Sequence, residues 1–291
     1  MHGKHQRCKV IWMKDHVTSP FSAHGVPRRS RIVVDEVTNE TVRQELEGDD
    51  RKLYYYGENV GLITFQDWFP TLELPRHMSH MATYDFPVRL KFVPDPFDSV
   101  PFLESPPERR GWNLDAWKLA ALELQEQGVR AIVGGCGLTG NIQSAIQSVV
   151  ELPVYMSTTC FVPEFVRVLE PGQKVGILTI GDGFMRGHDD ALFKECGIDP
   201  DGPIVVQGIY ESDQCERWLQ VNFDDFDQKD VEDAVVQICM GMIEREPAIS
   251  QFVFECTSLP PFSKAVEIAT GKPVFDAVDM MERVNAEVSN N

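Results

Sequence analysis

Short apolar runs alternate with amphipathic stretches along most of this chain. The runs are rich in Val and Ile, which is typical of strands buried on both faces of a parallel sheet. Strands are expected at residues 60–65, 86–93, 129–133, 153–156, 174–180, 204–209, 252–255 and 274–275. Helical spacing of apolar positions predicts helices at residues 114–128, 141–150, 163–169, 188–196, 231–246 and 261–270, and a closing helix after residue 275.

This alternation predicts an α/β fold made of parallel sheets that helices flank. We expect two pseudo-symmetric lobes, residues 57–165 and 170–275, with the active site in the cleft between them. Residues 276–291 are expected to form a C-terminal helix that crosses back to the first lobe. Residues 1–56 are rich in charge and show little periodicity, so they are interpreted as an N-terminal extension without an assigned fold.

The pseudo-symmetry is inferred from an internal repeat. Residues 128–155 align with residues 248–275 without a gap, and each segment carries one cysteine at the same place, Cys136 and Cys256. Ligands of parallel α/β sheets bind beyond the carboxyl ends of the strands. The two thiols are therefore expected to face each other across the cleft, which suits chemistry that needs a proton-handling group on each side of a carbon.

The turn around Cys136 is rich in glycine. Residues 135–140 match the Gly-x-Gly-x-x-Gly pattern of dinucleotide sites, but no acidic residue stands about 20 positions further on, and Asn141 occupies the place of a phosphate-loop lysine. A small ligand that approaches the backbone closely is the better interpretation. Amides at the start of the following helix can hold a carboxylate, and the same field lowers the pKa of a thiol.

The hydroxyl, amide and glycine residues around the two turns are the candidate substrate-binding groups. They are Gly137, Thr139, Asn141, Ser157 and Thr257. The remaining cysteines are interpreted as small apolar residues of the core: Cys8, Cys160, Cys196, Cys215 and Cys239. A group of aromatic residues in the first half allows two interpretations, core and lid packing or a wall for a cationic headgroup; it consists of Trp68, Phe69, Tyr84, Phe86, Trp112 and Trp117.

Composition narrows the class of partner. The net charge of −18 argues against binding to a nucleic-acid backbone. No run approaches the ~18 apolar residues of a membrane helix, and the polar N-terminus lacks the apolar core of a signal peptide. Seven scattered cysteines favour free thiols in a reducing compartment, and no metal-ligand spacing occurs. We therefore expect a soluble, intracellular protein without a metal site that binds a small carboxylate; apolar helix faces are compatible with a homo-oligomer.

Several segments resemble those of one enzyme superfamily. They are residues 60–63, 82–89, 128–137, 171–179, 255–261 and 270–276. On these segments the chain resembles the aspartate/glutamate/hydantoin racemase superfamily over about residues 58–280. In that superfamily two cysteines face each other across an interlobe cleft and work, without cofactor, on a carbon next to a carboxyl or carbonyl group. The resemblance implies that Cys136 and Cys256 are this catalytic pair.

The residues after the first cysteine depart from the racemase pattern. Amino-acid racemases of the superfamily have Asn-Thr there, whereas this chain has Gly137-Leu138. The superfamily also contains the dimethylsulfoniopropionate lyases of marine algae, decarboxylases and isomerases. The resemblance implies most directly a lyase that releases dimethyl sulfide and acrylate, with Cys256 as the base and Cys136 as its partner, or the reverse. A racemase of the aspartate/glutamate or hydantoin type is the alternative, and a binding or redox protein with incidental thiols is the third reading.

Overall fold

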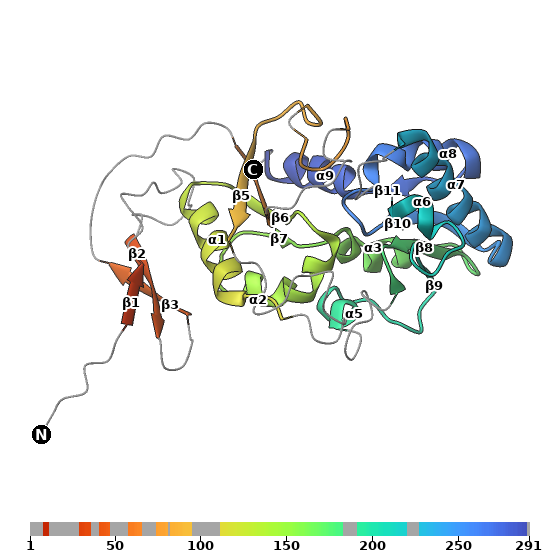
Figure 1. Cartoon of the computed structure of the whole chain (residues 1–291). Coiled ribbons are helices and arrows are strands. Elements are labelled where there is room, and N and C mark those ends of the chain that lie inside the picture. Colours follow the sequence, from red (N-terminus) through yellow and green to blue (C-terminus); the bar gives the residue numbers. More distant parts are fainter. Residues whose placement is uncertain are drawn as a thin grey trace, which may run out of the picture.

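The computed structural model describes residues 8–11, 29–35, 41–46, 58–65, 74–80, 82–94, 111–182, 191–219 and 227–289. Two four-stranded parallel sheets flanked by helices form the main body of this part of the chain (Figure 1). The predicted α/β class is therefore confirmed.

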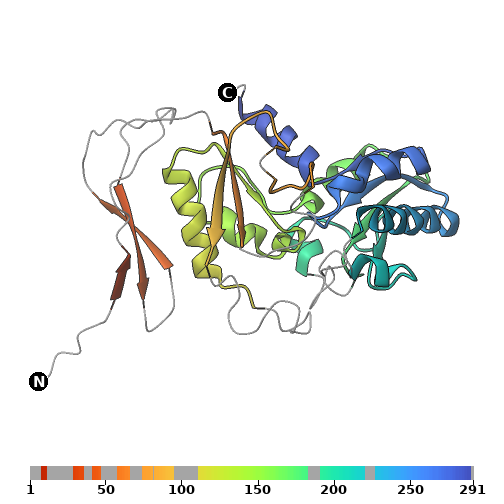
Figure 2. The same cartoon turned by 45° about the horizontal axis from the view of Figure 1, so that its top comes forward.

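The first sheet has the strand order β5-β4-β6-β7. Its strands are β4 (Val60–Phe65), β5 (Val88–Val93), β6 (Ala131–Gly134) and β7 (Val154–Tyr155), all parallel. Helices α1 (Leu114–Glu126) and α2 (Gln143–Gln147) cover one face, where Trp117 and Ile146 pack against Ile63 and Ile132. Helix α9 (Ala277–Ser289) covers the other face (Figure 2). Burial on both faces explains the uninterrupted apolar runs of β4 and β6.

The second sheet repeats this plan with the order β9-β8-β10-β11. Its strands are β8 (Lys174–Thr179), β9 (Ile204–Gly208), β10 (Ile249–Phe254) and β11 (Val274–Phe275). Helices α7 (Gln228–Arg245) and α8 (Ser263–Thr270) pack on one face. Helices α3 (Val162–Arg167) and α5 (Ala191–Glu195) pack on the other face. A short helix that the sequence pattern did not predict, α6 (Cys215–Leu219), follows β9.

Each sheet is covered by a helix that leaves the last strand of the other sheet. Helix α3 follows β7 of the first sheet, but its Val162 is buried against Val175 and Ile177 of β8. Helix α9 follows β11 of the second sheet, but its Met280 and Val284 are buried in the cluster around the first sheet. The sequence repeat thus corresponds to two copies of one unit of strands and helices, and the last helix of each copy covers the sheet of the other copy.

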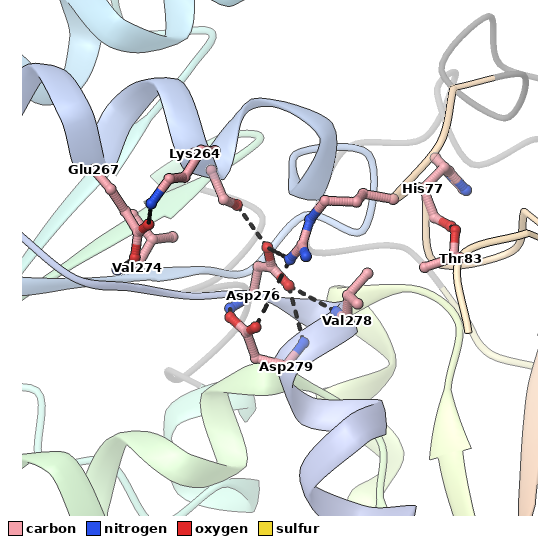
Figure 3. Close-up of polar contacts among 10 residues, drawn as sticks. His77, Thr83, Lys264, Glu267, Val274, Asp276, Val278 and Asp279 are labelled. Atoms are coloured by element: carbon pink, nitrogen blue, oxygen red, sulfur yellow. Dashed lines mark hydrogen bonds and ion pairs between the residues drawn. The ribbon is translucent and has the colours of Figure 1, made fainter. Parts of the chain in front are cut away.

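A buried carboxylate fixes the start of α9 (Figure 3). One oxygen of Asp276, Oδ1, accepts hydrogen bonds from the amides of Val278 (2.8 Å) and Asp279 (3.0 Å), which caps the helix. The other oxygen, Oδ2, accepts from Ser263 Oγ (2.6 Å) and Arg76 Nη2 (3.2 Å). Asp276 therefore ties α9 to α8 and to the segment before β5.

Some predicted elements differ at their ends. The helix expected at 141–150 begins with a 3-10 turn, η3 (Gly137–Ile142), before α2. The helix expected from residue 188 is seen as α5, and residues 183–190 lie outside the described part. Within the N-terminal extension, β1 (Cys8–Ile11), β2 (Arg29–Asp35) and β3 (Thr41–Leu46) pair as an antiparallel sheet. None of the helices in the described ranges has the length and apolarity needed to cross a bilayer.

Candidate active site

Cys136 lies just beyond β6, where the chain turns into η3. Its backbone is extended (φ −145°, ψ 131°), and it precedes the first residue of the 3-10 helix. The glycines on either side are needed for close packing. A Cβ at Gly135 would lie 2.5 Å from Thr64 Cβ, and one at Gly137 would lie 2.0 Å from the carbonyl oxygen of Glu255. The turn of the first lobe therefore lies directly against the turn of the second.

Cys256 occupies the equivalent position beyond β10, after the buried residue Glu255. The amide of Glu255 donates to Leu178 O (2.9 Å), which continues the sheet. Its carboxylate oxygen Oε2 accepts a hydrogen bond from Thr179 Oγ1 (2.8 Å) at the end of β8. The carboxyl side chain thus points back over the carboxyl ends of the strands, toward the turn that carries Cys136.

The structure brings Cys136, Cys256 and Glu255 into one electrostatic group. Burial is the main cause that raises the pKa of Cys136 far above its usual value, and the charges of Glu255 and Cys256 raise it further. Burial, with the charge of Glu255, raises the pKa of Cys256 to about 12. We therefore expect both thiols to be protonated at neutral pH.

Backbone amides oppose these shifts. Those of Leu138 and Thr139, at the start of η3, lower the pKa of Cys136. The amide and hydroxyl of Ser258 do the same for Cys256. The expected field of the helix start is present, but desolvation outweighs it.

Glu255 is the group in this site that titrates near neutral pH. Burial raises its pKa to about 7, and the hydrogen bond from Thr179 and the backbone at Ile180 oppose the rise. A carboxyl group with this pKa can both accept and release a proton under ordinary conditions. The motif Glu255-Cys256-Thr257 was noted in the sequence, but nothing in the periodicity distinguished this glutamate from a surface residue.

All three candidate substrate-binding hydroxyls have partners within the protein. Thr139 Oγ1 lies 2.6 Å from the carbonyl oxygen of Cys136 and 2.5 Å from that of Met156. Thr257 Oγ1 donates to Gly135 O (3.1 Å) across the two lobes. These side chains hold the turns in place. Gly137 is buried against Glu255, as described above.

The other two candidates differ from each other. Ser157 is buried at the end of β7, and its Oγ accepts from the amide (3.2 Å) and hydroxyl (2.7 Å) of Thr159. Asn141, in η3, has a buried Oδ1 without a hydrogen-bond partner in the described structure. An unsatisfied buried acceptor costs roughly 1–3 kcal/mol, and this oxygen could be satisfied only by a hydrogen-bond donor.

Most of the described aromatic residues belong to the core. Trp112 and Trp117 pack edge to face (ring centroids 5.5 Å apart) within the cluster under α1. Tyr84 and Phe86 pack together on the face of α9. These four therefore follow the packing interpretation, while Trp68 and Phe69 lie outside the described residues. In the same described part, no cluster of three or more His, Cys, Asp or Glu side chains could hold a metal ion.

Sequence comparison identifies relatives of one kind. Dimethylsulfoniopropionate lyase 3 of Emiliania huxleyi (strain CCMP1516) is 29% identical over 253 residues, which cover 84% of this chain and 63% of that protein. The dimethylsulfoniopropionate lyase of Durusdinium sp. clade D is 28% identical over 207 residues, covering 70% of this chain and 67% of that protein. The chain thus spans less than two thirds of the length of the first relative. The resemblance to dimethylsulfoniopropionate lyases drawn from the motifs is confirmed.

Among solved structures, an aspartate racemase homologue from Pyrococcus horikoshii OT3 matches 80% of this chain and 100% of its own, with 18% identity and a TM-score of 0.49. No protein-family model matches the chain.

Proposed function

We propose that this chain is a cofactor-independent lyase that cleaves dimethylsulfoniopropionate to dimethyl sulfide and acrylate, with Cys136 and Cys256 as the catalytic pair. The observation that carries the proposal is the meeting of two thiols, from equivalent turns of a duplicated fold, beside one buried carboxyl group, Glu255. The similarity to dimethylsulfoniopropionate lyases over most of the chain supports the choice of substrate.

In the proposed reaction Cys256, as thiolate, removes a proton from the carbon next to the substrate carboxylate. The electron pair forms the carbon–carbon double bond, the bond from the β-carbon to the sulfonium breaks, and dimethyl sulfide leaves as a neutral molecule. The thiolate becomes a thiol and the sulfonium loses its charge, so two opposite charges disappear together. A site as desolvated as this one favours such a step, because it has little water to stabilise the separated charges.

Glu255 is the proposed proton acceptor that makes the thiolate. Glu255 directly precedes Cys256 in the chain, and its carboxyl group lies against Gly137, which follows Cys136. The pKa of this carboxyl group is about 7. It would take the thiol proton before elimination and release it afterwards. Thr179 holds the carboxyl in place through the 2.8 Å hydrogen bond.

The carboxylate of the substrate is proposed to lie at the start of η3. Backbone hydrogen bonds of Leu138 and Thr139 reach the sulfur of Cys136 there, so this helix start lies in the site. Asn141 stands in the same short helix and remains a proposed substrate-binding residue. Amides in this position hold an anion and stabilise the enolate-like charge that develops during proton removal. Gly137, Thr139, Ser157 and Thr257 remain proposed substrate-binding residues, although the hydroxyls of the last three have partners within the protein.

The first experiment measures the reaction itself. The protein is incubated in D2O with dimethylsulfoniopropionate, aspartate and glutamate in turn. Release of acrylate from the first compound supports the lyase. α-Deuteration of an amino acid with loss of optical activity would instead identify a racemase that uses the same thiols on opposite faces. Turnover of none of the three refutes both assignments.

The second experiment removes the thiols one at a time. Cys136→Ala and Cys256→Ala should each lower kcat by ~10²–10⁴-fold, the usual contribution of a positioned acid or base. Cys239→Ala is the matched control, because this thiol is buried in α7 and belongs to neither turn. If either of the first two variants folds and keeps a near-normal rate, the paired-thiol assignment is wrong.

A further inference from the structure

A second pair of thiols lies close together, separate from Cys136 and Cys256. Cys160, in the 3-10 turn η4 (Thr158–Phe161), and Cys196, directly after α5, have their sulfur atoms 3.5 Å apart. The two residues come from opposite lobes: η4 follows β7 of the first sheet, and α5 packs on the second. Sulfur atoms joined in a disulfide are about 2.05 Å apart, so a movement of about 1.5 Å would bond them.

The surroundings of the two sulfur atoms are unequal. Cys196 is buried, and its Sγ lies 3.3 Å from Thr159 Oγ1, whereas Cys160 is partly exposed. The hydrogen bond from Cys196 lowers the pKa of Cys160, and backbone amides at Ser157 add to this. The same contact, together with burial, raises the pKa of Cys196. When neutral, Cys160 can also donate to Gln143 Oε1, 3.4 Å away.

Because the two sulfur atoms are in contact, one thiol can react with an oxidant and the other can resolve the product. We propose that Cys160 and Cys196 form a reversible disulfide when the protein meets a peroxide. The inference is independent of the lyase assignment, since it needs neither the substrate nor the other thiol pair. Both cysteines pack with apolar clusters, as expected for small residues of the core, and the proposal gives them a further role.

The chemistry balances with hydrogen peroxide as the oxidant. The sulfur of Cys160, as thiolate, attacks one peroxide oxygen; the O–O bond breaks, a sulfenic acid forms, and the second oxygen leaves as water after taking up a proton. Cys196 then attacks the sulfur of Cys160. The S–S bond forms, the S–O bond breaks, and the hydroxyl leaves with the thiol proton of Cys196 as a second water. Two thiols are oxidised and one peroxide is reduced.

The disulfide would form beside η3, the 3-10 helix that follows Cys136. Gly140 of η3 lies against Cys196 so closely that a Cβ there would be 3.1 Å from its sulfur. Cys196 Sγ also lies 4.0 Å from Gly140 O. Moving Cys196 toward η4 therefore changes the support of η3 from one side. The disulfide would join both lobes beside the candidate active site.

The test uses the full chain treated with hydrogen peroxide, alkylated and digested after glutamate residues. This cleavage places all seven cysteines on different peptides, with Cys160 on residues 152–164 and Cys196 on residues 196–211. The expected result is a cross-link between these two peptides, with an intact-mass loss of about 2 Da for two hydrogens, reversed by dithiothreitol. Peroxide that oxidises the protein without producing this cross-link overturns the proposal, including the case in which only Cys136 and Cys256 are joined.

Two variants sharpen the result. In Cys196→Ser the cross-link should be lost, and Cys160 should be trapped as a sulfenic acid by dimedone. In Cys239→Ser, which removes a buried thiol of α7 outside the proposed pair, the cross-link should persist. If Cys196→Ser does not fold, as judged by circular dichroism, the peptide map of the unmodified chain decides alone. A Cys196→Ser chain that folds but leaves Cys160 unreactive contradicts the proposed role of Cys160 as the attacking thiol.

Discussion

Glycine at position 137 is what lets a carboxyl group lie beside both thiols of the candidate site. Its Cα is in contact with Glu255, whose carbonyl and carboxyl oxygens fill the space that any side chain would need. The backbone of Gly137 is not in the left-handed region, so the requirement is for space and not for conformation. The carboxyl then determines the electrostatics, because it raises the pKa of both Cys136 and Cys256.

Gly137→Ala should therefore be damaging. The new Cβ would lie 2.0 Å from a backbone oxygen and 2.2 Å from Glu255 Oε1, so the two turns must separate. We expect a loss of unfolding free energy at the upper end of the usual ~1–3 kcal/mol for overpacking, and a large loss of turnover. Urea unfolding and steady-state kinetics measure the two effects.

Gly241→Ala in α7 is the matched control for that substitution. Its Cβ would meet only the flexible end of Arg245, at 3.2 Å, in the middle of a helix. Alanine is favoured over glycine there by roughly 0.5–1 kcal/mol, so this variant should gain stability and keep its activity. Equal behaviour of the two alanine variants would show that position 137 is not spatially constrained.

The raised pKa of Glu255 predicts how the stability of the protein depends on pH. Its pKa rises from 4.5 in the unfolded chain to about 7 in the folded protein. The folded state therefore binds more protons than the unfolded state between these values, and stability is lost as the pH rises through them. The loss amounts to about 3 kcal/mol for a shift of this size.

Glu255→Gln should remove that dependence. The difference in unfolding free energy between the unmodified chain and Glu255→Gln is measured at pH 5 and at pH 8. Other titrating groups, such as His77 with its pKa lowered to about 4 by burial, are common to both chains and cancel. The difference between the chains should change by about 3 kcal/mol in favour of the variant at pH 8. A difference that does not change with pH means that Glu255 is not buried as described.

At the scale of elements, single residues determine where α8 ends and where α9 begins. Helix α9 is capped by Asp276, which accepts hydrogen bonds from two amides of the helix and also from the side chains of Ser263 and Arg76 (Figure 3). Helix α8 ends at Gly271, whose left-handed backbone (φ +66°) terminates it before the exposed loop to β11. Gly271 lies within the second copy of the repeat and Asp276 directly follows it, so these anchors determine where the chain passes from the second sheet to the helix that covers the first.

Asp276→Ala should destabilise the protein by about 2–4 kcal/mol, since a helix cap and charged hydrogen bonds to a buried hydroxyl are lost together. Lys264→Ala is the control from the same region, because the Lys264–Glu267 pair (3.2 Å) is exposed. Exposed pairs contribute ~0–1 kcal/mol. Denaturant unfolding that finds the two variants equally stable would show that Asp276 is not an anchor.

At the scale of the whole molecule, the two lobes exchange hydrogen bonds as well as helices. Thr158 of the first lobe donates to Phe254 O of β10 (2.9 Å), two residues before Cys256. Thr257 of the second lobe donates to Gly135 O (3.1 Å), next to Cys136. The two bonds set the position of each thiol relative to the other, and neither was visible in the periodicity of the chain.

The strands and helices could be predicted from the sequence, but the side-chain contacts between the two lobes could not. Alternating apolar runs identify every strand of the two parallel sheets, because burial on both faces leaves an unmistakable composition. The repeat also brings Cys136 and Cys256 to equivalent turns. Glu255 and the Cys160–Cys196 pair could not be found this way, since a buried carboxyl and a thiol contact depend on which lobe surfaces meet, and no local pattern records that.

Thr158→Val and Thr257→Val test the bonds between the lobes. Each substitution keeps the shape of the side chain, leaves a carbonyl oxygen unpaired, and should cost ~1–3 kcal/mol. Turnover should fall by at least about tenfold, because a 1 Å misplacement of a reacting group can cost ~10²-fold. Thr270→Val breaks a bond of 2.7 Å to Val266 inside one lobe and should affect stability only. Kinetics in which all three variants behave alike would contradict this positioning role.

The exchange of α3 and α9 has a consequence for the origin of the molecule. Half of the chain could not cover both faces of its own sheet. A half-length ancestor would therefore have existed only as a twofold dimer, with one thiol contributed by each subunit. In such a dimer both copies change together, and Gly135 and Glu255, which align in the repeat, would have been the same residue. Fusion of the copies into one polypeptide would have removed that constraint, and it would have allowed a single acid to enter an otherwise symmetrical centre.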